Sequence, residues 1–363
     1  MIIRRTLLAS ISALAAIGLT CGMATAADDK KLAVVATFSI LGDMVGSIGG
    51  DHIKLTTLVG PNGDAHVYQP VPADARAVSE ADLLVVNGLA FEGWLDRLVD
   101  ASGFSGMRLV ATDGIEPLPF EEEGDHDDEK HGDDHADHKD DDHAGHKDDD
   151  HAEHKDDDHG HKDDDHAEHK DDDHAGHKDD DHHGHDHGAF DPHAWQSIEA
   201  AMVYIDNITA ALSKADPAHA SSYYQNRAAY VAELTALETE LRTMFDALPE
   251  DARTVVTPHD AFGYFADAYG LKFLAPQGIS TESEASAADV AKLIRQIRAE
   301  GIKGVFVENV ADSRLLEQIA NETGAVIGGS LYSDALSESD GPASTYLDMM
   351  RHNARTLAQA LSS

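Results

Sequence analysis

Residues 31–48 read KLAVVATFSILGDMVGSI, an apolar run rich in β-branched side chains that leads directly into a segment with helical spacing. The first part, 31–37, predicts a buried strand, and the apolar spacing over 39–48 predicts a helix. Further short apolar runs bounded by Gly, Pro and Asn predict three more strands, at 53–59, 82–87 and 107–111. Strands that alternate with helices indicate an α/β fold, in which helices flank a mostly parallel sheet.

The same alternation returns near the end of the chain. Apolar runs predict strands at 254–257, 272–275, 304–308 and 325–328, and helical patterns cover 286–299, 313–323 and 342–360. Between the two alternations lie two further helical patterns, at 194–214 and 217–248, the second of which Pro249 ends. That second helix would be about 45 Å long, which suits a rigid connector between two lobes.

These patterns divide the chain, whose 363 residues suffice for two domains of ordinary size. We expect an N-terminal lobe over 27–216, a long connecting helix over 217–248 and a C-terminal lobe over 249–363.

The first 26 residues predict a signal peptide and therefore export to the periplasm. Arg4 and Arg5 precede an apolar run that is shorter than the roughly 20 residues needed to span a bilayer. Ala24-Thr25-Ala26 has the small side chains of a cleavage site. Lipid attachment at Cys21 is an alternative, although Thr20 is a poor residue to precede a lipid-bearing cysteine.

The composition excludes several classes of protein. A formal net charge of −41 repels phosphate backbones, so nucleic-acid binding is excluded. A single cysteine can form neither an internal disulfide nor a cysteine-based zinc site. The unusual feature is the 24 histidines, 18 of which lie in residues 125–187 together with 25 Asp, 3 Glu and 7 Lys.

This segment, 125–187, is built on a repeat of the form HKDDDHAG and has no apolar side chain larger than Ala. It cannot bury a core, so we expect a disordered loop inserted in the N-terminal lobe. Histidines three or five residues apart and flanked by carboxylates can bind several metal ions, each weakly because ordering the chain costs entropy. A solubilising acidic loop is the alternative. The auxiliary metal ligands expected in the repeats are His138, His143, His146, His151, His154, His159, His161, His166, His169, His174 and His177.

Three of the remaining histidines follow strand ends or precede predicted helices. His66 follows a turn-rich segment, His193 stands in a loop before a helix, and His259 follows a strand and opens a helix. Open α/β sheets bind ligands at such positions, and Asp334 offers a fourth donor after the last predicted strand. Three imidazoles and one carboxylate form a suitable tetrahedral set for Zn²⁺. The other isolated histidines, His52, His219 and His352, are expected on the surface.

Five motifs resemble the zinc-binding solute-binding proteins of ABC transporters, the ZnuA group. They are GDAHVYQP at 63–70, DPHAW at 191–195, PHDAFGYFADAYGL at 258–271, GISTESEAS at 278–286 and LYSDALS at 331–337. The resemblance implies two α/β lobes, each a mostly parallel sheet flanked by helices, joined by one long rigid helix with the metal in the cleft between them.

The resemblance also implies a ligand set. His66 and His193 would be ligands from the first lobe and His259 the ligand from the second, where manganese-binding relatives usually have a carboxylate. Asp334 would close the site, with a water molecule as the alternative. Ala65 stands where some zinc-binding relatives have a Glu. We expect outer carboxylates or carbonyls to hold the other ring nitrogens.

The function implied is capture of Zn²⁺ in the periplasm and its delivery to the permease of an ABC transporter. The ATPase of that transporter would be an indirect partner. We expect the protein to act as a monomer. A zinc buffer or metallochaperone without a transporter is the alternative. We expect no enzymatic activity. The chain has no HExxH motif, and a fourth protein ligand would fill the coordination position that a catalytic zinc keeps open.

Overall fold

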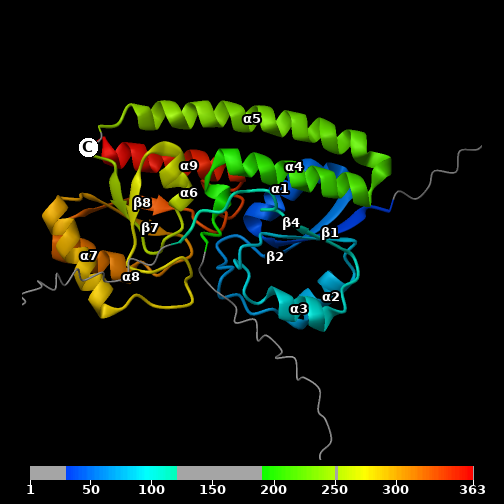
Figure 1. Ribbon diagram of the computed structural model, residues 1–363, viewed down its shortest axis with the longest axis horizontal. Coiled ribbons are helices and arrows are strands. Elements are labelled where there is room, and N and C mark those ends of the chain that lie inside the picture. The colour runs from blue at the N-terminus through cyan, green and yellow to red at the C-terminus, as the bar shows by residue number, and fades with distance from the viewer. Residues whose placement is uncertain (1–29, 121–189, 250–251, 363) are drawn as a thin grey trace, which may run out of the picture. The chain divides into compact units, whose positions relative to one another are not determined.

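The computed structural model describes residues 30–120, 190–249 and 252–362 (Figure 1). The predicted signal peptide and the predicted loop insertion with its histidines lie outside these residues. Within them no helix is both long enough and apolar enough to cross a membrane.

The first lobe is built on a parallel four-stranded sheet with the order β2-β1-β3-β4. Its strands are β1 (Leu32–Phe38), β2 (Ile53–Val59), β3 (Leu83–Val86) and β4 (Met107–Val110). Its helices are α1 (Ser39–Gly49), α2 (Pro72–Ser79), α3 (Leu95–Ser102) and α4 (Ile198–Ala215), of which α2 and α3 were not predicted. All four side chains of the inner strand β3 are buried, which explains its continuous apolar sequence.

The second lobe repeats this topology in a second parallel sheet with the order β6-β5-β7-β8. Its strands are β5 (Thr254–Val256), β6 (Lys272–Leu274), β7 (Gly304–Glu308) and β8 (Val326–Leu331). Its helices are α6 (Gly263–Tyr269), α7 (Ala287–Glu300), α8 (Arg314–Thr323) and α9 (Tyr346–Leu361). The two sheets confirm the predicted α/β fold class.

Helix α5 (Ala220–Asp246) runs alongside helices of both lobes (Figure 1). It packs on α1 and α4 of the first lobe and on α6 and α9 of the second. It is shorter than the predicted 217–248, because Pro217–His219 form a separate 3-10 turn before it. At its other end, the Arg253 side chain donates to the carbonyl oxygens of Phe245 and Leu248. The boundaries of the lobes themselves remain a prediction.

Two predicted helices also begin later than expected, and in each case a cap explains the start. Helix α4 begins at Ile198 rather than 194, because the Ser197 side chain accepts from the Ala200 N–H and Ala194–Gln196 form a 3-10 turn. Helix α9 begins at Tyr346 rather than 342, because the Thr345 side chain accepts from the Asp348 N–H.

Candidate metal centre

The four predicted donors come from segments at the carboxyl ends of the parallel strands. His66 follows β2, His259 follows β5 and Asp334 follows β8, while His193 directly precedes the 3-10 turn before α4. His259 does not open a helix as predicted, because α6 begins only at Gly263. Since both sheets present their carboxyl ends to the same place, residues far apart in the sequence converge there.

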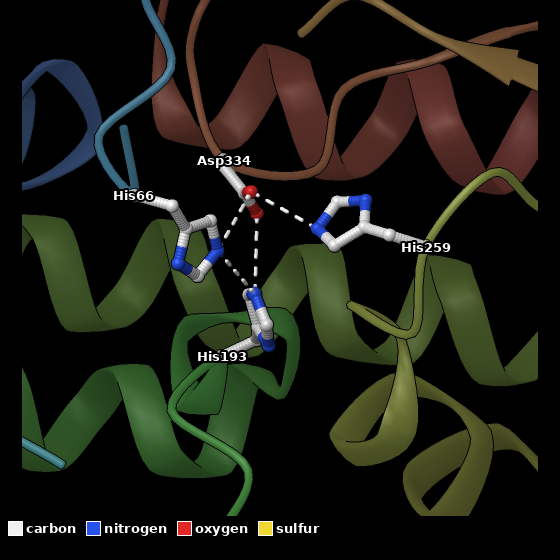
Figure 2. Close-up of side chains that lie close together, drawn as sticks. All are labelled: His66, His193, His259 and Asp334. Atoms are coloured by element: carbon white, nitrogen blue, oxygen red, sulfur yellow. Dashed lines mark hydrogen bonds and ion pairs between the residues drawn. The ribbon is translucent and has the colours of Figure 1, made fainter. Parts of the chain in front are cut away.

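The side chains of His66, His193, His259 and Asp334 point toward one another (Figure 2). One donor atom from each lies within 4.8 Å of all the others, and all four residues are buried. The Nε2 atoms of His66 and His193 are 3.3 Å apart. The Asp334 carboxylate oxygens lie 3.4 Å from His66 Nε2, 3.5 Å from His193 Nε2 and 3.1 Å from His259 Nε2.

These four separations are close to those of donors around a single small ion, and the remaining two pairs of imidazole donors lie within 4.8 Å of each other. Four donors arranged tetrahedrally at about 2.0–2.1 Å from an ion lie about 3.3–3.4 Å from one another. The Asp334 Oδ1 atom is buried without a hydrogen bond in the part of the chain that the structure describes. A buried carboxylate oxygen without a partner is costly, and a cation between the four side chains would remove that cost.

His193 is oriented by the carboxylate that precedes it in the DPHAW motif. The Asp191 Oδ1 atom lies 2.7 Å from His193 Nδ1 and also accepts from the His193 N–H at 2.9 Å. The side-chain amide of Asn87 donates to the Pro192 carbonyl at 2.9 Å and holds the same turn. The Nε2 atom of His193 is therefore directed at the other donors. Asp191 is an outer carboxylate that holds the other ring nitrogen, as expected from the sequence.

His259 is oriented by Glu308, which the sequence analysis did not predict in this role. The Glu308 Oε2 atom lies 2.7 Å from His259 Nδ1, and both side chains are fully buried. Glu308 is the last residue of β7, so a carboxylate at the end of a predicted strand was the signal available in the sequence. Asp260, although adjacent to His259, makes no contact with an imidazole nitrogen among the described interactions.

The segment that carries Asp334 follows the second sheet but is hydrogen-bonded to the first lobe. The Ser333 carbonyl accepts from Trp195 Nε1 at 2.9 Å and from Gln196 Nε2 at 2.8 Å. Two residues after Asp334, the Leu336 N–H donates to Ser39 Oγ at 2.9 Å. The Leu336 carbonyl accepts from the Asn62 N–H at 2.8 Å. Asp334 is thus fixed relative to His66 and His193.

Burial and mutual attraction set the charges of the site. Burial lowers the pKa of His66, which favours the neutral imidazole that a metal requires. Burial would raise the pKa of Asp334, but His259 and His193 hold it well below its usual range. Burial would lower the pKa of His259, but the carboxylates of Glu308 and Asp334 hold it well above the usual value. In the metal-free chain, the pKa directions therefore favour a proton on His259 over one on His66.

The other isolated histidines lie outside this cluster. His219 Nδ1 is 2.7 Å from Asp216 Oδ2, and the His52 ring stacks on the His219 ring with centroids 4.0 Å apart. His352 Nε2 is 3.0 Å from the Ser330 carbonyl. All three are half-buried rather than fully exposed, because each is engaged with a neighbouring side chain or carbonyl.

Comparison with known proteins gives the family. The sequence model of the ZnuA family, described as "Zinc-uptake complex component A periplasmic", matches residues 34–360. The manganese-binding lipoprotein MntA of Halalkalibacterium halodurans is 28% identical over 355 residues, which cover 97% of each chain. The iron-binding protein YfeA of Yersinia pestis is 30% identical over 330 residues, covering 91% of this chain and 86% of that protein.

A solved structure has the same fold. The periplasmic zinc-binding protein TroA of Treponema pallidum matches with a TM-score of 0.70 and 26% sequence identity, over 91% of this chain and 99% of that one. Other relatives are named as substrate-binding lipoproteins of metal, manganese or iron ABC transporters. These matches agree on metal binding and transport, and they differ in the metal.

Proposed function

The chain belongs to the ZnuA family of metal-binding substrate-binding components of ABC transporters, and from this premise we propose that its cargo is Zn²⁺. The ion would be held by His66, His193, His259 and Asp334, taken up in the periplasm and passed to a membrane permease. Family membership agrees with the prediction that the chain is a binding protein and not an enzyme.

The observation that carries the proposal is the donor set of the buried cluster. Imidazole nitrogen is a borderline donor that suits zinc, whereas manganese is better served by carboxylate, carbonyl and water oxygens in octahedral sites. Here three of the four converging side chains are imidazoles, and four of the donor separations, at 3.1–3.5 Å, are close to the spacing expected around a tetrahedral ion. This donor set favours zinc over the manganese named for one of the relatives.

Export also forms part of the proposal. The N-terminal residues 1–26 would act as a signal peptide that directs the chain to the periplasm, which is the location stated in the family description. These residues lie outside the part of the chain that the structure describes.

The histidine-rich segment 125–187 would serve as an auxiliary collector or sensor of zinc. Its histidines outnumber those needed for one site, and carboxylates alone would provide solubility. The test is zinc uptake by cells at limiting zinc, with the full-length protein compared with a variant that lacks 125–187. Equal uptake by the two would exclude a role in collecting zinc.

Metal analysis of a single-residue variant tests the cleft site. His259→Ala in the chain lacking 125–187 should lower zinc affinity about a hundredfold, since four donors share roughly 10–16 kcal/mol of binding free energy. His352→Ala is the matched control, because its imidazole contacts the Ser330 carbonyl outside the cluster. Unchanged tight zinc binding by His259→Ala would exclude this site.

A further inference from the structure

The carboxylate of Asp64 connects a metal donor to a residue of the opposite lobe. Its Oδ1 atom accepts from the His66 N–H at 2.9 Å. Its Oδ2 atom accepts from the Thr281 hydroxyl at 2.6 Å. One side chain of the first lobe is therefore shared between the His66 backbone and a side chain of the second lobe.

Thr281 lies on a segment that is also joined to the other side of the site. In this segment, residues 275–286 between β6 and α7, Gln277 forms a parallel bridge with His259. The Gly278 carbonyl accepts from the Asp260 N–H at 3.2 Å. The Gln277 side chain donates to the Thr281 and Ser283 carbonyls and braces the segment. The segment thus links the residues around His259 to the turn that carries His66.

The link between Thr281 and Asp64 is the part of this arrangement that solvent can reach. Both residues are only half-buried, whereas the four donors are buried. They line a cavity of about 510 Å³ together with Pro258, the residue before His259. A single hydrogen bond at the edge of a cavity breaks more readily than the buried contacts deeper in the site.

His193 and Asp334 have supports that do not involve this segment. His193 is held by Asp191, and the Asp334 segment is bonded to Trp195, Gln196 and residues of the first lobe. In its own lobe, the His66 turn has the bond from Trp94 Nε1 to the adjacent Ala65 carbonyl at 2.7 Å, and the His66 ring packs on the Phe91 ring with centroids 4.6 Å apart. Loss of the Thr281 contact would act on His66 through Asp64, whose other carboxylate oxygen accepts from the His66 N–H.

We propose that Thr281 is a positioning residue for metal release, because its hydroxyl fixes the Asp64 carboxylate and, through it, the His66 donor. Breaking this hydrogen bond releases the Asp64 carboxylate and loosens His66 within a turn that stays joined to the second lobe through Asn62, whose N–H donates to the Leu336 carbonyl. The loosened His66 donor opens a route for the ion. The proposal rests on the proposed metal site and adds to it the step that controls how long the ion stays.

The test measures the rate at which cobalt(II), used as a probe for zinc, leaves the full mature chain. The chain has two tryptophans, and both lie at the site: Trp195 is 5.3 Å from the His193 ring and Trp94 holds the His66 turn. Bound cobalt should quench their emission. Mixing with excess EDTA should restore it at the dissociation rate, without a contribution from segment 125–187, which has no tryptophan.

Thr281→Val keeps the shape of the side chain and removes the donor. It should release cobalt about tenfold faster, the effect of losing one hydrogen bond to a charged group. Thr281→Ser keeps the hydroxyl and should release cobalt within about twofold of the natural chain, and so should Ser283→Ala on the same segment. The thermal midpoint of the metal-free chain should fall by no more than about 4 °C in any of the three variants, because the contact is a single hydrogen bond outside the apolar cores.

Three results would overturn the proposal while leaving the metal site intact. They are release from Thr281→Val at the natural rate, equal acceleration in Thr281→Ser, and a thermal midpoint of Thr281→Val lowered by more than about 4 °C. Failure of the proposed site would look different, since cobalt would then not quench the natural chain, or would quench His259→Ala equally. That outcome would remove the basis of both proposals.

Discussion

The segments that carry Asp334 and His259 both follow strands of the second sheet, yet they are held in opposite ways. Four hydrogen bonds, donated or accepted by Trp195, Gln196, Ser39 and Asn62, fasten the Asp334 segment to the first lobe. His259 is supported within its own lobe by Glu308 and by the bridge to Gln277.

This difference divides the site into a group of three donors and a single donor. His66 and His193 belong to the first lobe, and Asp334 is joined to it by these bonds while its segment also stays bonded to the second lobe, where Asn309 Nδ2 donates to the Ala335 carbonyl. His259 completes the set from the second lobe. Part of the second lobe also has a separate apolar core, formed by side chains of β5, β7, α7 and α8. A change in the relation of the lobes would therefore act on His259 and on the Thr281 contact before it acted on the other three donors.

The largest effect should come from Asp334→Ala. We expect zinc affinity to fall about a thousandfold, more than the loss expected for His259→Ala, because this change removes the one negative charge among the four donors. Competition against a chelator measures both variants. A larger loss of zinc affinity in His259→Ala than in Asp334→Ala would contradict the expectation that the carboxylate contributes more to binding than this imidazole.

Acidification from pH 8 to pH 6 should weaken zinc binding about a hundredfold. Burial would lower the pKa of His259, but Glu308 and Asp334 hold it well above its usual value, so the metal-free site keeps a proton that zinc must displace. One proton released per ion changes the affinity about tenfold per pH unit. The number of protons released per zinc ion can be measured directly with a pH indicator in a weakly buffered solution. An affinity independent of pH would contradict the assignment of this proton to His259.

The same proton changes the stability of the metal-free chain in a defined direction. A histidine whose pKa is raised by folding stabilises the folded state fully below its unfolded value of about 6.5. That contribution is lost as the pH rises through the higher pKa of the folded state. Zinc binding should therefore raise the thermal midpoint more at pH 8 than at pH 6.

Glu308→Gln should lower zinc affinity about tenfold, because carboxylates that orient metal-binding imidazoles typically contribute factors of about 10–100. It should also flatten the pH dependence, since the carboxylate that raises the pKa of His259 is gone. Asp191→Asn is the matched change on His193 and should lower affinity without altering the proton on His259. An identical pH dependence of zinc affinity in the two variants would contradict the inference that Glu308, and not Asp191, raises the pKa of His259.

The smallest effect on zinc should come from Gln196→Met. It removes one of the two donors to the Ser333 carbonyl, while Trp195 Nε1 and the contacts of Leu336 remain. We expect zinc affinity to change less than about threefold and the free energy of unfolding to fall by about 1–2 kcal/mol. Isothermal titration and chemical denaturation measure the two quantities. A large loss of affinity would mean that the Asp334 segment depends on this single bond.

The fold class was predictable because the inner strands of both sheets, such as β3 and β7, are short apolar runs, and buried parallel strands have such sequences. Helices α2 and α3 were missed, since each has only eight residues and therefore too few turns to show a clear helical period. Helix α6 was predicted, but it begins at Gly263 rather than at His259. Helix starts at Ile198 and Tyr346 depend on the caps Ser197 and Thr345, which set the boundary more exactly than periodicity does.

The four converging residues were predictable because each follows a strand or precedes a helix in a recognisable motif. Their supports were predictable only where they are local. Asp191 stands two residues before His193, whereas Glu308 reaches His259 from the neighbouring strand β7. The link from Thr281 to Asp64 likewise spans the two lobes, and pairings of that kind follow from tertiary structure and not from spacing in the sequence.

The measurement that tests the central claim most directly is a chelator-competition titration of the mature chain lacking residues 125–187, with zinc and then with manganese. We predict one tightly bound zinc ion and much weaker manganese binding, because three imidazoles and one carboxylate converge at tetrahedral separations. Manganese bound as tightly as zinc, or no tight zinc at all, would contradict the assignment of a zinc site to His66, His193, His259 and Asp334.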